Sequence, residues 1–256
     1  DYHIIPMVAA IWSMPPYEAS QMPLSFFLKF FQNHGLFKLK NRPQWYTVKN
    51  RSRTYVNKIL NKISGEHYKN YKINLIKRHK ENIEIFYGEK NEFFVYDKVV
   101  IATHADEALS ILDKPTDEEK NLLSNFKYKN NLAVIHTDKN QMPRNKKAWS
   151  AWNAKLNKNV RENSSITYWL NLLQNLKIDE DIFLSLNPFD KIEEKKILNK
   201  VTFTHPYYDK LALENQARLK KIQNVNNTLF CGSYFGYGFH EDGITSAIDM
   251  LKSFHD

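Results

Sequence analysis

The sequence has little glycine and almost no cysteine, and each shortage excludes a class of protein. Only 7 of its 256 residues are glycine, under half the usual share of roughly 7%. With Cys231 as the single cysteine, the chain has neither a disulfide framework nor a cysteine-based zinc site. We therefore expect a cytoplasmic protein in a reducing compartment. The longest apolar stretch, Ile4 to Trp12, contains Pro6 and is far too short to span a bilayer.

The length and the apolar content of the chain are enough for a buried core. Hydrophobic residues make up 42% of the sequence and aromatic residues 14%, which excludes a disordered chain. A chain of 256 residues can form one large domain or two small ones. It opens with Asp1 rather than Met, so we expect a trimmed chain or part of a longer protein.

The formal net charge of +9 invites a polyanion-binding interpretation. However, 30 of the basic residues are lysine and only 7 are arginine, beside 27 asparagines. Lysine and asparagine share AT-rich codons, whereas arginine, the residue that reads guanine and clamps phosphate, is scarce. The lysines are also scattered along the chain, so we predict a diffusely charged surface and no nucleic-acid partner, with polyanion binding as the alternative. None of the nine histidines forms a close ligand pair, and no metal site is predicted.

Hydrophobic periodicity gives the expected order of elements. Helices are expected in most of 4–40, over 54–63, after His104, and over 209–223 and 242–254. Strands are expected over 45–49, 71–79, 83–87, 93–103, 132–137, 148–154, 166–170, 182–187, 201–205 and 228–231. Four consecutive apolar residues in 97–103 are typical of a strand covered on both faces. The segment 128–205 is interpreted as an antiparallel sheet inserted between parts of an α/β domain.

Two aromatic features suggest either packing or a site. Phenylalanines recur at helical spacing at positions 26, 27, 30 and 31, which favours core packing, with the lining of an apolar pocket as the alternative. Four of the seven glycines fall within 230–243, a segment that runs from a strand into a helix. Free amides at such a helix N-terminus suit a phosphate or a developing anion, and the interleaved aromatics could wall a planar ring. The alternative is an ordinary tight connection. The spacing fails as a dinucleotide fingerprint, because Glu241 stands where a third glycine is needed.

Several motifs together resemble the FAD-dependent amine-oxidase-like flavoproteins, and more narrowly a bacterial subgroup of predicted NAD/FAD-binding proteins. They are IWSMPP at 11–16, NHGL at 33–36, RPQW at 42–45, VIATHAD at 100–106, AWSAWN at 148–153, TYW at 167–169 and the glycine/aromatic segment 230–243. The resemblance implies an α+β fold of amine-oxidase/glutathione-reductase type. Its Rossmann-like FAD-binding portion would comprise 41–107 and 202–256, and an inserted antiparallel-sheet substrate domain would comprise 1–40 and 108–201.

The same resemblance implies the location of an FAD site. Its implied cofactor-binding residues are Ile76, Ala102, Thr103, Gly232, Ser233, Asp242, Gly243, Ile244 and Thr245. Ile76 would contact adenine through its backbone, and the start of the helix near Asp242 would turn its amides to the pyrimidine carbonyl of the flavin. Ser233 replaces an acidic residue of the wider family. The aromatic walls beside the flavin would come from Tyr237, Phe239 and His240, none of which is assigned a catalytic role.

The implied reaction is the oxidation or desaturation of a small hydrophobic substrate, such as a lipid or isoprenoid, or of an amine. It would proceed by hydride transfer to the flavin. The aromatic-rich helices at the start of the chain favour a hydrophobic small molecule as partner. The sequence predicts no transmembrane segment and leaves peripheral membrane contact open. A lyase or isomerase that uses flavin without net redox chemistry is a further alternative.

The chain departs from the family pattern in two places. No G-x-G-x-x-G turn for the FAD pyrophosphate is present, and residues 49–52 lack the paired glycines that the wider family shows there. We therefore predict the C-terminal portion of a longer flavoprotein, which on its own would bind FAD weakly or not at all. The competing hypothesis is a non-catalytic fragment or interaction module that has lost its dinucleotide-binding turn.

Overall fold

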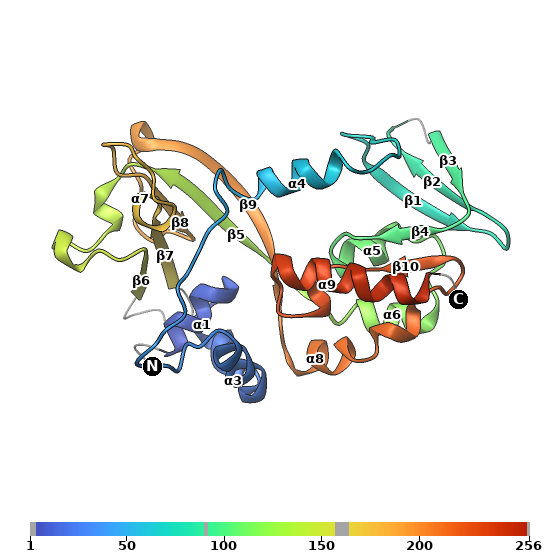
Figure 1. The fold of residues 1–256 in the computed structure, drawn as a ribbon, viewed down its shortest axis with the longest axis horizontal. Coiled ribbons are helices and arrows are strands. Elements are labelled where there is room, and N and C mark those ends of the chain that lie inside the picture. The colour runs from blue at the N-terminus through green and yellow to red at the C-terminus, as the bar shows by residue number, and fades with distance from the viewer. Residues whose placement is uncertain (1–3, 90–91, 157–163, 255–256) are drawn as a thin grey trace.

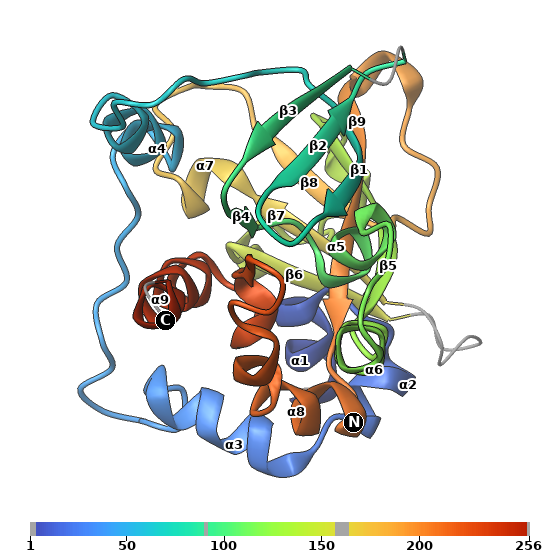
Figure 2. The ribbon, with the colours of Figure 1, turned by 90° about the vertical axis from the view of Figure 1, so that its right-hand side faces the viewer.

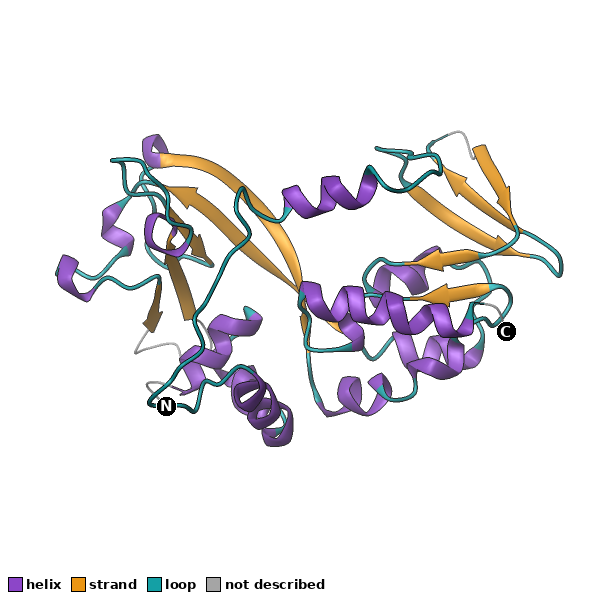
Figure 3. Cartoon of the chain, in the orientation of Figure 1, coloured by secondary structure: helices purple, strands orange, loops and turns teal. Residues whose placement is uncertain are grey.

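The computed structural model describes residues 4–89, 92–156 and 164–254 (Figure 1). Helices and strands are mixed throughout, as the α+β prediction requires (Figure 3). The long strands β5 (Lys127–His136) and β9 (Ile197–Tyr207) extend from one half of the molecule to the other. No helix among the described residues is long and apolar enough to cross a bilayer.

The first half of the molecule begins with three helices, as expected for 4–40. They are α1 (Ile4–Trp12), α2 (Pro16–Gln21) and α3 (Leu24–Asn33). Proline precedes both α2 and α3, where its fixed φ suits the start of a helix. Trp12, Phe27, Phe30 and Phe31 are buried in one cluster with Tyr208, which follows β9. The aromatic stripe therefore packs a core, as favoured above.

An antiparallel sheet lies against these helices, in the strand order β6-β7-β8-β5-β9. Its remaining elements are β6 (Trp152–Leu156), β7 (Ser164–Trp169), α7 (Leu170–Leu173) and β8 (Phe183–Leu186). Short 3₁₀ turns join them at Lys139–Gln141, Lys146–Ala148 and Glu194–Lys196. The predicted antiparallel sheet is confirmed. The strand expected over 148–154 begins later, at Trp152, after a 3₁₀ turn that ends at Ala148 and an irregular stretch over 149–151.

The other half combines a meander with a parallel strand pair. The meander consists of β1 (Ile73–Arg78), β2 (Ile83–Tyr87) and β3 (Glu92–Tyr96), and the parallel pair of β4 (Val99–Ile101) and β10 (Thr228–Phe230). Around them lie α5 (Ala105–Ile111), α6 (Asp117–Leu123), α8 (Lys210–Gln216), α9 (His240–Met250) and 3₁₀ turns at Leu219–Ile222, Ser233–Phe235 and Leu251–Ser253. Their buried side chains form one core cluster that joins β1, β4, α5, α6 and β10.

Four expectations for these elements are wrong. The segment 45–49 is exposed and belongs to no strand, because no neighbouring strand supplies ladder hydrogen bonds. The run 93–103 is split between β3 and β4, which belong to different sheets. β4 is not covered on both faces, since Val100 is 39% exposed. The helix expected over 209–223 is interrupted, with α8 ending at Gln216 and a 3₁₀ turn following from Leu219.

The packing of α6 bears on the domain boundaries. Leu122 and Leu123 of α6 and the adjacent Phe126 belong to the core cluster of β4 and β10, not to that of the antiparallel sheet. The predicted division of the chain, with 108–201 in a substrate domain, stays a prediction. The packing favours a boundary closer to Lys127, where β5 begins.

One connection stands apart from both halves. After α3, the chain runs along one edge of the molecule to α4 (Arg53–Leu60), and Figures 2 and 3 show this connection as loop. Every residue from 37 to 51 is exposed, and α4 has no buried residue. This part of the chain has no core of its own.

Candidate functional site

The carboxyl edge of the parallel pair gathers the largest group of predicted site residues. Phe230 pairs with Ile101, and the Cys231 amide donates to the Ile101 carbonyl at 3.1 Å. Immediately beyond the strands, Ala102 and Thr103 are exposed, while Gly232 and Ser233 are half-buried. The carboxyl ends of parallel strands are a common location for ligands in α/β proteins. Four of the nine predicted cofactor-binding residues therefore share one open edge.

The first turn of α9 is fixed against this edge by Ser246. The Gly232 amide donates to Ser246 Oγ at 2.9 Å, and that hydroxyl donates to the Gly243 carbonyl at 2.7 Å. A Cβ at Gly232 would lie 2.8 Å from the Tyr234 ring, so the turn itself requires glycine there. A Cβ at Gly243 would have only the Ser233 amide nitrogen within reach, at 4.0 Å. Gly243 thus has open space beside it.

α9 begins two residues earlier than predicted, at His240. Asp242 caps the helix, because its Oδ2 accepts from the Phe239 amide at 2.9 Å. The Gly243 amide already donates to the Phe239 carbonyl at 3.1 Å. The amides left without a partner inside the helix are therefore those of His240, Glu241 and Asp242. The expected amide contacts of Gly243, Ile244 and Thr245 with a cofactor stay a prediction. Because the helix begins at His240, its free amides lie at 240–242, before these three residues.

Two carboxylates modify the electrostatics of this helix end. Glu241 and Asp242 both lie in the first turn, where they offset the positive end of the helix dipole. An anionic phosphate is thereby disfavoured relative to a neutral carbonyl group. Thr245 lines a separate cavity of about 320 Å³, together with Gly236 and Asp242. Gly236 approaches Asp242 so closely that a Cβ there would lie 2.2 Å from Oδ1.

The three aromatic candidates pack toward the N-terminal helices. The Tyr237 ring lies 4.7 Å from that of Phe26, and its carbonyl accepts from Trp12 Nε1 at 3.0 Å. Phe239 stacks on Phe30 at 5.5 Å. Burial, and to a lesser extent the Asp242 carboxylate, raises the pKa of Tyr237. These contacts occupy one side of each ring, and a role beside a flavin stays a prediction.

His240, the third candidate, contacts a residue that the sequence did not identify. The Tyr55 hydroxyl of α4 is hydrogen-bonded to His240 Nδ1, and the ring centroids are 6.1 Å apart. This contact joins α4, which has no buried residue, to the first residue of α9. The two residues lie 185 positions apart, and no local pattern indicates such a pair.

Residues 49–52, which lack the paired glycines of the wider family, have a backbone conformation that favours glycine. Asn50 and Arg51 have φ values of 62° and 68°, in the left-handed region that costs most residues energy. Asparagine adopts this conformation at little cost, whereas arginine adopts it at a cost in energy. The turn before α4 thus keeps its geometry without the residues that adopt it most easily.

The remaining predicted residues are less suited to their roles. Ile76 is only 2% exposed, and its carbonyl accepts from the Asp113 amide at 3.0 Å. The expected contact of this backbone with adenine stays a prediction. Burial raises the pKa of the Cys231 thiol, which favours an inert side chain over a reactive thiolate. Among the described residues, no three His, Cys, Asp or Glu side chains form a metal-binding group.

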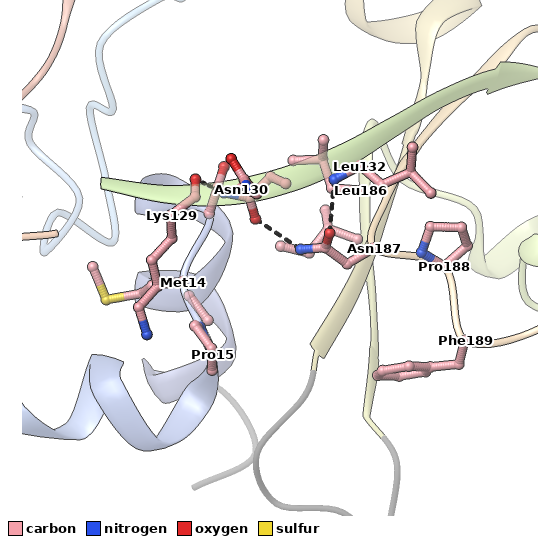
Figure 4. A pocket seen from close by; sticks show the side chains of 13 residues that line it. Met14, Pro15, Lys129, Asn130, Leu132, Leu186, Asn187, Pro188 and Phe189 are labelled. Carbon is pink, nitrogen blue, oxygen red and sulfur yellow. Dashed lines mark hydrogen bonds between the residues drawn. The ribbon is translucent and has the colours of Figure 1, made fainter. Parts of the chain in front are cut away.

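The antiparallel sheet borders another cavity, of about 420 Å³, against α1 (Figure 4). Apolar groups from Met14, Leu186 and Phe189 line it. Its polar lining comes from Ser13, Lys129, Asn130, Asn131 and Asn187. The Asn187 side chain accepts from the Leu132 amide at 2.9 Å and donates to Asn131 Oδ1 at 2.7 Å. A cavity with this mixed lining suits a small molecule that combines an apolar part with polar groups.

Neither a protein-family model nor a curated protein sequence matches the chain. Among solved structures, a putative protoporphyrinogen oxidase from Exiguobacterium sp. 255-15 is similar with a TM-score of 0.66 and 11% identity, over 98% of this chain and 62% of its own. Cyclohexylamine oxidase from Brevibacterium oxydans IH-35A has a TM-score of 0.61 and 11% identity, and the match covers 99% of this chain and 64% of the oxidase. A CLA-producing fatty acid isomerase from P. acnes has a TM-score of 0.55 and 12% identity, and the match covers 80% of this chain and 52% of the isomerase. The chain has a mixed α+β fold that resembles part of the amine-oxidase-like flavoproteins, and it spans less than two thirds of the chains it matches.

Proposed function

We propose that the chain is the larger part of an FAD-dependent oxidoreductase that oxidises or desaturates a small hydrophobic or amine substrate. The observation that carries this proposal is the open carboxyl edge of β4 and β10, with the first turn of α9 fixed beside it. The fold similarity supports it, since two of the similar proteins are named oxidases. FAD would supply the hydride acceptor.

The residues at this edge fit one part of such a cofactor. Ala102 and Thr103 are accessible at the end of β4, and Gly243 leaves space for a flat group to approach the helix backbone. The free amides of His240 and Glu241 can donate to a carbonyl oxygen. That donation would stabilise negative charge gained on reduction, against the partial repulsion of Glu241 and Asp242 in the same turn. Nothing among the described residues provides a second, glycine-rich cradle for a pyrophosphate.

The chain's own side chains would position the substrate. Tyr237 and Phe239 connect the edge to the aromatic core of α3, and the Tyr55–His240 contact fixes α4 across from them. The Tyr237 hydroxyl is protonated at neutral pH, as for any tyrosine, and can donate a hydrogen bond; burial raises its pKa further. The cavity beside β8 is the candidate location for the substrate, with Met14, Leu186 and Phe189 beside its hydrophobic part.

Gly243→Ala provides a sharp test of cofactor binding. The added methyl group meets no protein atom closer than 4.0 Å, and alanine favours the helix over glycine by up to about 1 kcal/mol. The fold should therefore be unharmed, while a flavin against the helix backbone would be displaced. We expect FAD affinity to fall at least roughly tenfold, measured by flavin absorbance near 450 nm and by equilibrium dialysis.

The matched control is Gly65→Ala, at an exposed position with only Ile63 at 4.0 Å. It should leave FAD binding unchanged. Both variants should be made in the 256-residue chain and in the longest reading frame that contains it, because the isolated chain is expected to bind FAD weakly. If the longest product is colourless and does not take up FAD, the proposed function is wrong.

A second reaction class is favoured by one comparison, since a fatty acid isomerase has the same fold at a TM-score of 0.55. Anaerobic bleaching of the flavin by amines or lipids would support net oxidation. Product formation from an unsaturated fatty acid without lasting bleaching would support isomerisation.

A further inference from the structure

The net charge of the protein is concentrated in one segment. Between Glu18 and Glu66 the chain has nine basic residues and no acidic one, while the remainder has 28 of each sign. We call residues 19–65 the cationic strap. Its nine basic residues are Lys29, Lys38, Lys40, Arg42, Lys49, Arg51, Arg53, Lys58 and Lys62. The whole formal charge of +9 is therefore local, although the lysines looked scattered along the sequence.

The basic side chains of the strap are free to meet a partner. All nine are exposed. None forms an ion pair with an acidic side chain in the part of the chain that the structure describes. By contrast, most lysines of β5 and β9 and of the 3₁₀ turns near them have an acidic neighbour, as Lys196 has Asp138. The strap thus presents uncompensated positive charge.

Large apolar side chains are exposed among these charges. Leu39 is 90% exposed, Tyr46 87% and Trp45 66%. The strap also exposes Leu24, Leu28, Phe37, Val48, Val56, Ile59 and Ile63. Along 37–40, Phe37 and Leu39 alternate with two lysines. Aromatic and aliphatic groups interleaved with lysine are the composition of surfaces that lie in the interface of a bilayer.

The base of the strap also contains an apolar hollow of about 310 Å³. Phe27, Phe31 and Phe37 contribute rings to it, and Arg42 lies at its border. The Arg42 Nε donates to the Lys38 carbonyl at 2.8 Å, and Arg42 has no carboxylate partner among the described residues. An apolar hollow bordered by a guanidinium suits the acyl chain and the anionic headgroup of one lipid.

We propose that the cationic strap binds the surface of a membrane that contains anionic lipids. Charge complementarity selects an anionic partner, and the exposed leucine, tryptophan and tyrosine select one with an apolar interior. A DNA duplex would satisfy only the first requirement. A single strand could also stack its bases on Trp45 and Tyr46. It has, however, no apolar interior for Leu28 and Leu39, and the strap has twice as many lysines as arginines. The proposal does not depend on the proposed oxidoreductase function.

Vesicle sedimentation tests the proposal with the 256-residue chain and with the longest reading frame that contains it, and the strap should bind in both. The probes are vesicles of phosphatidylcholine alone and of phosphatidylcholine with about one third phosphatidylserine. Each basic residue near an anionic surface strengthens partitioning roughly fivefold. We expect the triple variant Lys38→Gln/Lys40→Gln/Arg42→Gln to weaken binding to the anionic vesicles roughly a hundredfold. Leu39→Ser/Tyr46→Ser should weaken it about tenfold or more, because apolar contact is lost at unchanged charge.

The matched control is Lys147→Gln/Lys177→Gln/Lys221→Gln, which removes the same charge from exposed positions outside the strap. It should change binding less than threefold. All substituted residues are exposed, so circular dichroism should show the same fold in every variant. Equal binding to neutral vesicles, or an equal loss in the control, would overturn the proposal. So would tighter binding to a DNA duplex than to vesicles, or self-association through the strap without lipid.

Discussion

Charged side chains are buried and paired in the core beneath the meander, whereas in the cationic strap they are exposed and unpaired among the described residues. In the core, Arg78 and Glu119 are 5% and 0% exposed and form a two-pronged ion pair, with Nη1 at 2.5 Å and Nη2 at 2.9 Å from the carboxylate. In the strap, nine basic residues are exposed, and none is paired with an acidic side chain of the described residues. The comparison shows that the core satisfies its buried charges internally, whereas the charges of the strap face solvent, which is the basis of the proposed membrane contact.

The largest effect is expected where the core ion pair is broken. Glu119 also accepts from the Thr116 amide at 2.6 Å, and Arg78 donates to the Lys114 carbonyl at 2.7 Å. Arg78→Met would leave a buried carboxylate without its cation, which costs about 3–5 kcal/mol of unfolding free energy. Urea denaturation followed by circular dichroism measures this loss.

The comparison with the strap supplies the control. Arg42→Met removes the same kind of side chain from an exposed position and should change the unfolding free energy by less than about 0.5 kcal/mol. The double variant Arg78→Met/Glu119→Leu should recover much of the loss, since no charge is then left buried. If Arg78→Met and Arg42→Met were equally stable, the core would not depend on its ion pair.

A second buried group makes stability depend on pH. Burial lowers the pKa of His136 to about 4 from its ordinary 6.5, against a smaller opposing effect of the Asp138 carboxylate. Its Nδ1 accepts from the Asp138 amide at 3.0 Å, and its Nε2 contacts Ser185 Oγ at 2.8 Å, so the neutral ring is the one bound. Between pH 6.5 and 4, His136 takes up a proton in the unfolded chain but stays neutral in the folded chain. Stability should therefore be complete above pH 6.5 and fall by about 3 kcal/mol as the pH drops to 4.

The measurement is the difference in unfolding free energy between the protein and His136→Asn across this pH range. That difference should shrink as the pH falls. His67→Asn, at an exposed position just beyond the strap, should run parallel to the unchanged protein. A constant difference for His136→Asn would mean that His136 is charged in the folded state.

The sequence predicted well those elements whose signal is local. Prolines at 15, 16 and 23 mark the breaks between α1, α2 and α3, and alternating apolar residues mark the strands of the antiparallel sheet. The segment 45–49 has the composition of a strand, yet a strand also needs hydrogen bonds from a neighbour, and composition cannot show whether one exists. The same limit explains why 93–103 looked like one strand, although its two halves pair with β2 and β10.

The candidate site was predictable only in part, for a related reason. Glycine concentration identified 230–243, and the structure brings Gly232 and Ser233 beside Ala102 and Thr103 as expected of parallel strand ends. The contact of Tyr55 with His240 depends on tertiary structure alone. The strap could have been found from the sequence, because the absence of acidic residues between Glu18 and Glu66 is visible there.

The smallest expected effect tests the turn at which the strap enters α4. Arg51 has a φ of 68°, which costs an ordinary residue about 1–2 kcal/mol and glycine nothing. Part of the gain is offset because glycine gives the unfolded chain more freedom. Arg51→Gly should therefore stabilise α4 by about 0.5–1 kcal/mol. Arg53→Gly, the same exchange at the first residue of α4, should destabilise it by a similar amount, since glycine is a poor helix former. Amide hydrogen exchange within α4 measures both changes in stability. If the strain resides at residue 51, the two changes must have opposite signs. Loss of a positive charge alone would instead shift both variants in the same direction.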